Sequence, residues 1–316
     1  MNISQLPIAY VTNTDSDDIS VVSISARKEI GRIPIGGSPR GSVRFDADKR
    51  FGYVSNCAGN TISVLDLSSN TEVGKIEVGL APRGLTLSGD GAFAYVSNSG
   101  ENTLSVVDLD SRSVVSKIEM SDNPRHMGIS SDGSMIFVSQ WGSDSIAVID
   151  VSAPTKPRVV KEVSVGENAR PYSVAVHHGS DVLFVANTQA TYISVIDTRT
   201  LEEVNRIEVG YGGRAITLNR DKSYAFASVE NTNELVSINT RDQSVRSRVE
   251  VGPSPRGIAY VDADEEVEGG SFSRSAFVNP AARNALFSVN VKDPEDLEVV
   301  GYVKVGLGPC SVSILQ

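Results

Sequence analysis

The sequence predicts an all-β fold, a seven-bladed β-propeller with four antiparallel strands in each blade. One short motif, which begins with an aromatic residue, recurs seven times. The aromatic residues are 43, 42, 42, 47, 42 and 51 residues apart, which is the repeat length that four-stranded blades need. The copies are Tyr10-Val-Thr-Asn13, Tyr53-Val-Ser-Asn56, Tyr95-Val-Ser-Asn98, Phe137-Val-Ser-Gln140, Phe184-Val-Ala-Asn187, Phe226-Ala-Ser-Val229 and Phe277-Val-Asn-Pro280.

Each repeat has the pattern of four short strands. In one unit, strand-like alternation of apolar and polar residues covers segments 84–87, 92–96, 103–107 and 114–119. Gly, Asp and Asn separate these segments, as expected for strands that are joined by tight turns. No segment of useful length has a helical period. We therefore expect a single β-propeller domain that covers residues 1–316.

The two ends of the chain predict how the ring closes. The sequence begins in the second strand of a unit, at residues 8–11, and ends in the first strand of a unit, at residues 311–315. An unpaired strand edge exposes backbone hydrogen-bonding groups, and a closed ring hides them. We therefore expect the C-terminal inner strand to pair with the N-terminal strand and complete one blade.

The repeated motif also carries a family resemblance. Tyr-Val-Thr-Asn at 10–13 and Tyr-Val-Ser-Asn at 53–56 and 95–98 resemble the repeat of the YVTN β-propeller family, and the resemblance extends over nearly the whole chain. It implies the fold but no particular activity, because such propellers include surface proteins, electron-transfer subunits, lactonases and lyases.

Composition limits the partners that we expect. The formal net charge of −10 disfavours nucleic acid and anionic membranes, which both bind basic surfaces. Two cysteines, Cys57 and Cys310, are too few for a disulfide framework. The first residues lack the basic and apolar segments of a secretion signal, so we expect a cytoplasmic protein, with a removed signal as the alternative. We also expect a monomer.

An arginine recurs at one position in the loops that join the blades. The five copies are Arg40, Arg83, Arg125, Arg214 and Arg256. These loops should surround one mouth of the channel, where guanidinium groups would bind a carboxylate or phosphate with two hydrogen bonds. The alternative is structural, with each arginine bonded to the neighbouring blade.

Five residues depart from the repeat on the same side of the ring. His126 replaces a glycine, Gln140 and Trp141 replace an asparagine and a small residue, and Tyr172 and Cys310 replace the arginine. We expect His126 to be a general acid or base near neutral pH and Tyr172 to stabilise an oxyanion. Gln140, Trp141 and Cys310 would contact the substrate. The alternative is that His126 and Trp141 pack between blades.

These patterns predict an enzyme that works without a metal or other cofactor. The three histidines are not spaced as metal ligands, and the sequence has no phosphate-binding loop or haem-attachment motif. We expect a lactonase, lyase or isomerase that uses acid–base chemistry on a small anionic substrate at the channel mouth. The alternative is a non-catalytic propeller that binds a ligand or a protein.

Overall fold

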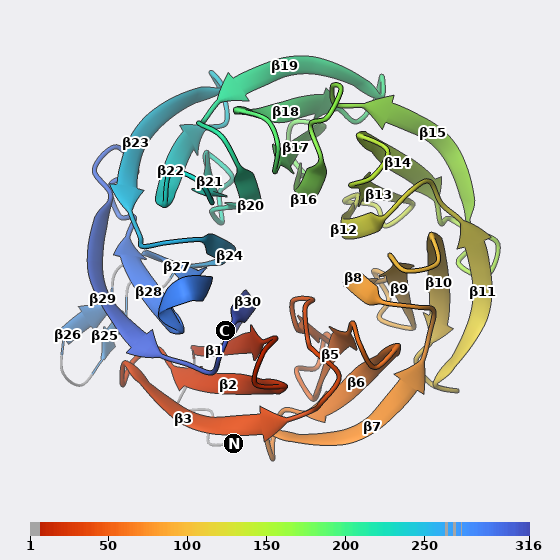
Figure 1. The fold of residues 1–316 in the computed structure, drawn as a ribbon, viewed down its shortest axis with the longest axis horizontal. Coiled ribbons are helices and arrows are strands. Elements are labelled where there is room, and N and C mark those ends of the chain that lie inside the picture. Colours follow the sequence, from red (N-terminus) through yellow and green to blue (C-terminus); the bar gives the residue numbers. More distant parts are fainter. Residues whose placement is uncertain (1–6, 263–264, 268–269, 273) are drawn as a thin grey trace.

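The protein forms a closed ring of four-stranded antiparallel sheets around a central channel (Figure 1). A computed structural model describes residues 7–262, 265–267, 270–272 and 274–316. Within these ranges there are seven four-stranded sheets, which confirms the predicted fold. None of the helices in this part of the chain has the length and apolar character that a membrane crossing requires.

Each blade extends from an inner strand at the channel to an outer strand at the rim. In that order, the first blade contains β30 (Pro309–Leu315), β1 (Ile8–Asn13), β2 (Asp18–Ser23) and β3 (Lys28–Pro34). The second blade contains β4 (Arg44–Phe45), β5 (Phe51–Asn56), β6 (Thr61–Asp66) and β7 (Thr71–Glu77). The third blade contains β8 (Pro82–Leu87), β9 (Phe93–Asn98), β10 (Thr103–Asp108) and β11 (Ser113–Glu119). The next two contain β12 (Pro124–Ile129), β13 (Met135–Gln140), β14 (Ser145–Asp150) and β15 (Arg158–Ser164); and β16 (Pro171–His177), β17 (Val182–Asn187), β18 (Tyr192–Asp197) and β19 (Glu202–Glu208). The last two contain β20 (Gly213–Leu218), β21 (Tyr224–Val229), β22 (Glu234–Asn239) and β23 (Ser244–Glu250); and β24 (Pro255–Val261), β27 (Ser275–Pro280), β28 (Ala285–Asn290) and β29 (Glu298–Lys304). A short hairpin, β25 (Glu265–Val267) and β26 (Gly270–Phe272), and the 3₁₀ turn η2 (Ala281–Arg283) belong to the last blade's connections.

The C-terminal strand closes the ring. β30 pairs with β1 in antiparallel register, with Tyr10 opposite Ser313 and Val11 opposite Val312. Figure 1 shows the C-terminus at β30, on the channel side of β1. The predicted closure is therefore confirmed, and the first blade consists of strands from both ends of the chain.

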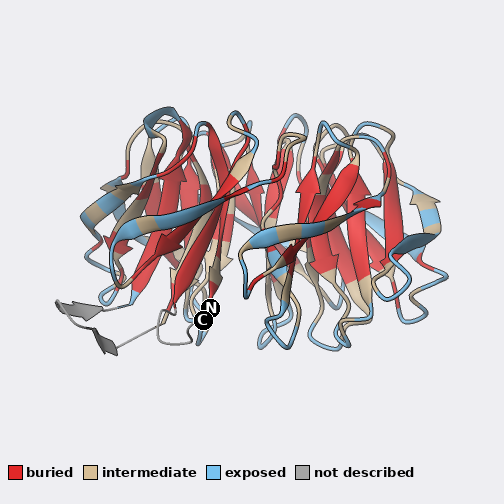
Figure 2. Ribbon diagram, turned by 90° about the horizontal axis from the view of Figure 1, so that it is seen from below, coloured by how far each residue is buried: buried red, intermediate tan, exposed pale blue. Residues whose placement is uncertain are grey.

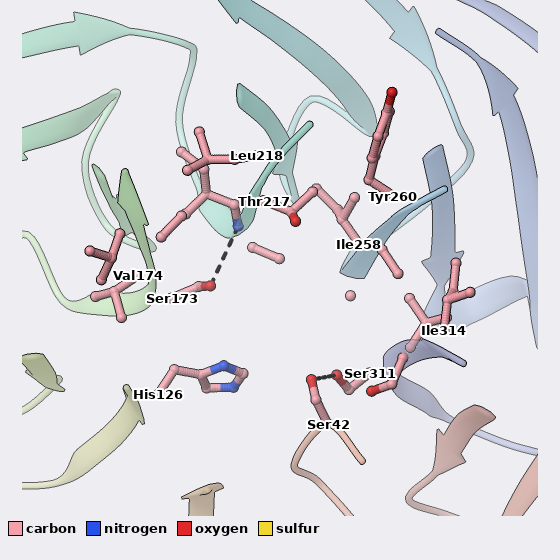
Figure 3. A pocket seen from close by; sticks show the side chains of 18 of the residues that line it. Ser42, His126, Ser173, Val174, Thr217, Leu218, Ile258, Tyr260, Ser311 and Ile314 are labelled. Atoms are coloured by element: carbon pink, nitrogen blue, oxygen red, sulfur yellow. Dashed lines mark hydrogen bonds between the residues drawn. The ribbon is translucent and has the colours of Figure 1, made fainter. Parts of the chain in front are cut away.

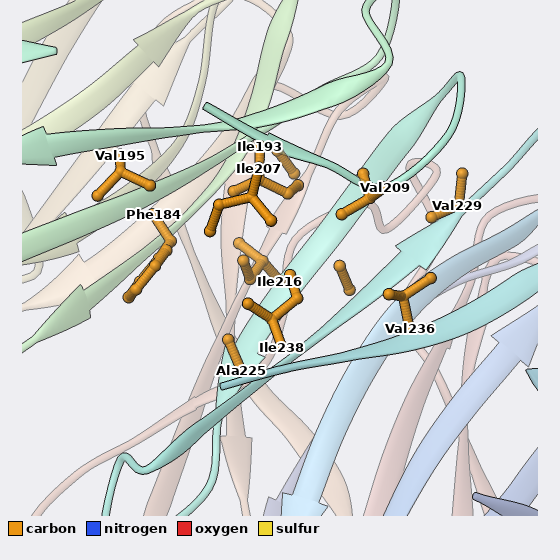
Figure 4. Close-up of a cluster of buried hydrophobic side chains, with 12 residues drawn as sticks. Phe184, Ile193, Val195, Ile207, Val209, Ile216, Ala225, Val229, Val236 and Ile238 are labelled. Atoms are coloured by element: carbon orange, nitrogen blue, oxygen red, sulfur yellow. The ribbon is translucent and has the colours of Figure 1, made fainter. Parts of the chain in front are cut away.

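Apolar side chains pack between neighbouring blades. Alternate residues of a strand point to opposite faces of its sheet, so each blade contributes to two interfaces. In the described residues, a buried apolar cluster lies at each of the seven blade interfaces. Figure 4 shows one, where Phe184 of β17 lies on one side and Ile216 and Ile238 of the next blade lie on the other. Burial is concentrated in the inner and middle strands, whereas the outer strands carry exposed residues (Figure 2).

The chain enters every inner strand with the same backbone geometry. A residue in the left-handed region, with φ between 50° and 97°, precedes the first residue that pairs with the second strand of each blade. Six of the seven entries then show a β-bulge. A bulge changes the direction of a side chain, and the bulged residue is the one at the repeated arginine position. The left-handed residues are Ser38, Ala81, Asn123, Arg170, Gly212, Ser254 and Gly308.

Candidate functional site

A cavity of 710 Å³ lies in the channel (Figure 3). Six of the seven inner strands line it, and it extends from Tyr172 and Cys310, near the strand starts, to His178 and Tyr260, near the strand ends. It therefore follows the channel well beyond the predicted mouth. Five arginine and lysine residues and, in the described part of the chain, no acidic residue line the cavity: Arg44, Arg214, Arg220, Lys222 and Arg256. An acidic protein thus encloses a basic channel.

His126 projects from β12 into this cavity (Figure 3). Its ring centroid lies 4.9 Å from that of Tyr172. The pKa of His126 is lowered to about 3, first by burial and then by the charges of four arginines, Arg44, Arg214, Arg125 and Arg83. The imidazole of the free protein is therefore neutral at neutral pH. A neutral imidazole can accept a proton or a hydrogen bond.

Arg44 is a cavity residue that the sequence patterns did not single out. Its Nε donates a hydrogen bond to the carbonyl of Leu85 at 2.9 Å. Arg44 is an exposed residue at the channel, but protein atoms surround its charged group, and this burial lowers the pKa of Arg44. Arg44 pairs with the motif aromatic Tyr53, and the residues that pair with the same aromatic in other blades are Thr86, Gly128 and Thr217. A single arginine at a position where other blades carry small residues was therefore the signal that could have found it.

Three arginines and two aromatic rings alternate at the start of the inner strands. The Cζ of Arg170 lies 4.7 Å from the centroid of the Trp141 ring, and the Cζ of Arg125 lies 5.0 Å from it. Arg125 is also 5.4 Å from the Tyr172 centroid, and Arg214 is 3.8 Å from it. Such distances are typical of cation–π contacts. We call these five side chains, Arg170, Trp141, Arg125, Tyr172 and Arg214, the arginine–aromatic stack.

Burial and nearby arginines make Arg125 a less basic group than usual. Burial, followed by the charge of Arg83, lowers the pKa of Arg125 to about 10, although Tyr172 acts in the opposite direction. The group still carries a full charge at neutral pH. Buried N–H groups without a hydrogen-bond partner among the described residues occur on Arg40, Arg83, Arg125, Arg170 and Arg256.

Glu230 is the carboxylate that pairs with the arginines near this mouth. Its Oε2 lies 3.6 Å from Nη1 of Arg214, and its Oε1 lies 3.7 Å from Nε of Arg256. Against the effect of burial, Tyr172 and Glu230 raise the pKa of Arg214. The ion pairs found among the described residues do not include Arg83 or Arg125. The positive charge around His126 is therefore compensated only on the Glu230 side.

The predicted site residues fall into three groups. The cavity is lined by His126, Tyr172, Arg214, Arg256 and Cys310. Four others lie outside the lining of the cavity: Arg40, Arg83, Arg125 and Trp141. Of these, Arg125 and Trp141 belong to the arginine–aromatic stack.

Gln140 forms the third group and has a structural place. It is fully buried, where its Oε1 accepts a hydrogen bond from the backbone of Ser121 and its Nε2 donates to Ser145 and Glu162. These partners hold its amide within the blade, so we no longer expect Gln140 to contact a ligand. Across the described ranges, no three His, Cys, Asp or Glu side chains gather as a metal site would require.

Two families match different parts of the chain. The YNCE-like β-propeller family matches residues 125–265, and the cytochrome d1 haem domain matches residues 5–126. No curated protein matches the chain.

Solved structures show the same fold at low sequence identity. The periplasmic gluconolactonase of Pseudomonas aeruginosa is 16% identical, with 98% of this chain and 99% of that chain covered and a TM-score of 0.81. A candidate 6-phosphogluconolactonase of Bacteroides fragilis is 13% identical, with both chains fully covered and a TM-score of 0.80. The dihydro-haem d1 dehydrogenase NirN is 17% identical, with 97% of this chain and 74% of that chain covered and a TM-score of 0.69.

At these identities, the likeness to solved structures shows the fold alone. The family matches are more specific, because the YNCE-like match includes three of the seven aromatic motifs. Together with the repeat and the seven-bladed ring, this match confirms the predicted resemblance of the chain to YVTN-repeat β-propellers.

Proposed function

We propose that the protein is a lactonase-type hydrolase that acts on a small substrate with a carboxylate or phosphate group. The observation that carries this proposal is the set of arginines around a neutral His126, in a cavity where no described lining residue is acidic. Such a field attracts anions and raises their local concentration. Two neighbours with lactonase names support the choice of reaction class at the level of the fold.

The residues of the cavity, and the two arginines beside it, suggest how the reaction would proceed. Arg83 and Arg125 would hold the anionic group, because their charges have no carboxylate partner among the described residues. The negative charge of the bound substrate group would offset the arginine charges. The pKa of His126 would therefore rise toward the range in which imidazole accepts a proton. His126 would then take a proton from water as the water oxygen attacks the lactone carbonyl.

The attack would place negative charge on the carbonyl oxygen, which Arg44 or Arg214 could stabilise. When the intermediate collapses, the ester C–O bond breaks and the protonated His126 returns its proton to the ring oxygen, which leaves as a hydroxyl. Water is the only co-reactant, so atoms and charge balance.

Replacement of His126 tests this role. His126→Gln should reduce kcat for the hydrolysis of 6-phosphogluconolactone by about 100-fold or more, as the loss of a general base does, with little change in melting temperature. Proton release at constant pH measures the rate. The matched control is His177→Gln, because His177 lies outside the cavity lining and its Nε2 contacts the carbonyl of Lys222. Full activity of the His126 variant would refute the mechanism.

Binding of a haem-type group is a second candidate, favoured by the match of residues 5–126. The side chains of the cavity fit such a group. The neutral imidazole of His126 faces the cavity, and the arginines beside His126 could pair with the carboxylates of the haem. A bound haem would supply redox chemistry. Titration with haemin should then give a shifted Soret band that His126→Gln abolishes and His177→Gln retains. An unshifted band would exclude this candidate.

A further inference from the structure

Arg125 lies between two aromatic rings, those of Trp141 and Tyr172. Ring contacts of this kind restrict the positions that a guanidinium can take, while its N–H groups carry its hydrogen-bonding capacity. The Nε of Arg125 is buried without a hydrogen-bond partner in the described chain. Carboxylates and phosphates accept hydrogen bonds in the guanidinium plane. Arg125 therefore presents the part of the group that an oxyanion binds.

The rings also contact arginines that would otherwise repel one another. The Trp141 ring contacts Arg170 and Arg125, and the Tyr172 ring contacts Arg125 and Arg214. The face of an aromatic ring carries partial negative charge, which offsets part of this repulsion. The stack thus lets several positive charges stay close together without carboxylates, which would compete with an anionic ligand.

Trp141 is itself fixed in place. Its Nε1 donates to the hydroxyl of Thr188 at 3.0 Å, and its backbone N–H donates to the carbonyl of Asn123 at 3.0 Å. Arg170 donates from Nη1 to the carbonyls of Trp141 and Gly142 at 3.1 and 3.0 Å. These bonds connect two neighbouring blades at Trp141, so the ring that contacts Arg125 has little freedom to move.

Two departures from the repeat create this arrangement together. Trp141 stands where other blades carry Cys57 or Ser99, and Tyr172 stands where others carry an arginine. Either change alone would give Arg125 only one ring contact. We propose that Trp141 and Tyr172 are positioning residues that hold Arg125 edge-on to the anionic group of the substrate. The proposal rests on the proposed function, because it assumes that an anion binds beside Arg125.

Calorimetric titration with inorganic phosphate and with gluconate tests the proposal. Trp141→Leu and Tyr172→Leu should each weaken binding about ten-fold, as expected for a desolvated cation–π contact. Trp141→Phe and Tyr172→Phe retain a ring and should lose less than about three-fold. Thr188→Val tests how far anchoring of the indole matters, because it removes the hydroxyl that accepts from Trp141 and donates to the carbonyl of Arg170, and it should weaken binding less than Trp141→Leu does. Circular dichroism melting shows whether each variant is folded.

The chain contains one tryptophan, so its fluorescence reports on the stack without any variant. The emission of the wild-type protein should change on addition of phosphate, with the same midpoint as the calorimetric titration. Binding without a fluorescence change, or equal affinities of the leucine and wild-type proteins, would overturn the positioning role and leave the proposed anion site intact. Absence of binding to the wild-type protein would overturn both.

Discussion

At the scale of single residues, the main feature is a neutral histidine among arginines. Burial, and then the charges of Arg44, Arg214, Arg125 and Arg83, keep the His126 imidazole unprotonated at neutral pH. An anion offsets the arginine charges, so ligand binding and the protonation of His126 should favour each other. The same residue therefore links the charge of the channel to the chemistry that we propose.

This linkage has a consequence for acid stability. The pKa of His126 falls from 6.5, its ordinary value, to about 3 in the folded protein. Between these values the unfolded chain binds a proton that the folded chain does not, so His126 makes stability decrease as pH falls from about 6.5 to 3. His126→Gln should remove this contribution. Urea unfolding of both proteins at pH 7 and pH 4.5 measures it.

The other titrating groups contribute equally to the free energy of unfolding of both proteins, so their contributions cancel in the comparison. The wild-type protein should lose more stability than His126→Gln over this interval. Equal losses would show that His126 has an ordinary pKa, and that neither burial nor the arginines act on it.

At the scale of elements, the inner strands set the position of every mouth residue. A left-handed residue precedes each of these strands, and six of the seven then show a bulge. Close contacts between neighbouring blades fix the strands further. Gly84 of β8 lies against β12 so closely that a Cβ atom there would be 2.1 Å from the carbonyl oxygen of Arg125. The backbone that carries Arg125 is therefore held by the preceding blade.

Replacement of Gly84 tests this contact. Gly84→Ala should destabilise the protein by about 1–3 kcal/mol, the usual cost of overpacking, because the obstructing atom belongs to the backbone. It should also weaken phosphate binding, since β12 must move with Arg125. Gly89→Ala is the control, because a Cβ at Gly89 meets nothing within 4 Å. Thermal unfolding and calorimetry measure both effects, and a Gly84→Ala protein with wild-type stability and affinity would contradict the contact.

At the scale of the whole molecule, closure depends on one strand. β30 completes the first blade and places Val312 and Leu315 in two of the interfaces between blades. Its loss would open the ring and expose the edge of β1, and exposed edges are prone to pair with other chains.

Truncation tests how far the ring depends on this strand. Removal of residues 311–316 should abolish the cooperative unfolding transition and promote aggregation, whereas removal of Gln316 alone should leave both unchanged. Circular dichroism melting and size-exclusion chromatography show the outcome. A truncated protein that melts cooperatively near the wild-type temperature would show that closure by β30 is dispensable.

The fold could be predicted from the sequence because the repeat has a constant register. The seven aromatic motifs placed the blades, and the positions of residues 8–11 and 311–315 indicated the closure. The site was harder to predict, since side-chain direction depends on contacts across blades. Arg44 was missed because its partner comes from the next blade, and Gln140 was misplaced because its amide is satisfied within its own blade.

The charge environment could not be read from the sequence either. His126 was expected to titrate near neutral pH, since nothing in the linear order shows that four arginines from β4, β8, β12 and β20 lie around it. The stack of Arg170, Trp141, Arg125, Tyr172 and Arg214 likewise joins residues that are up to 89 positions apart.

Binding of a small anion in the channel beside His126 is the central claim, and a crystal structure of the protein with 6-phosphogluconate tests it most directly. This ligand carries both a carboxylate and a phosphate. We predict that one of these groups lies within hydrogen-bond distance of Arg83 or Arg125, with the rest of the molecule next to His126. An empty channel at saturating ligand, or a ligand held only at the opposite end by Lys222 and His178, would contradict the claim.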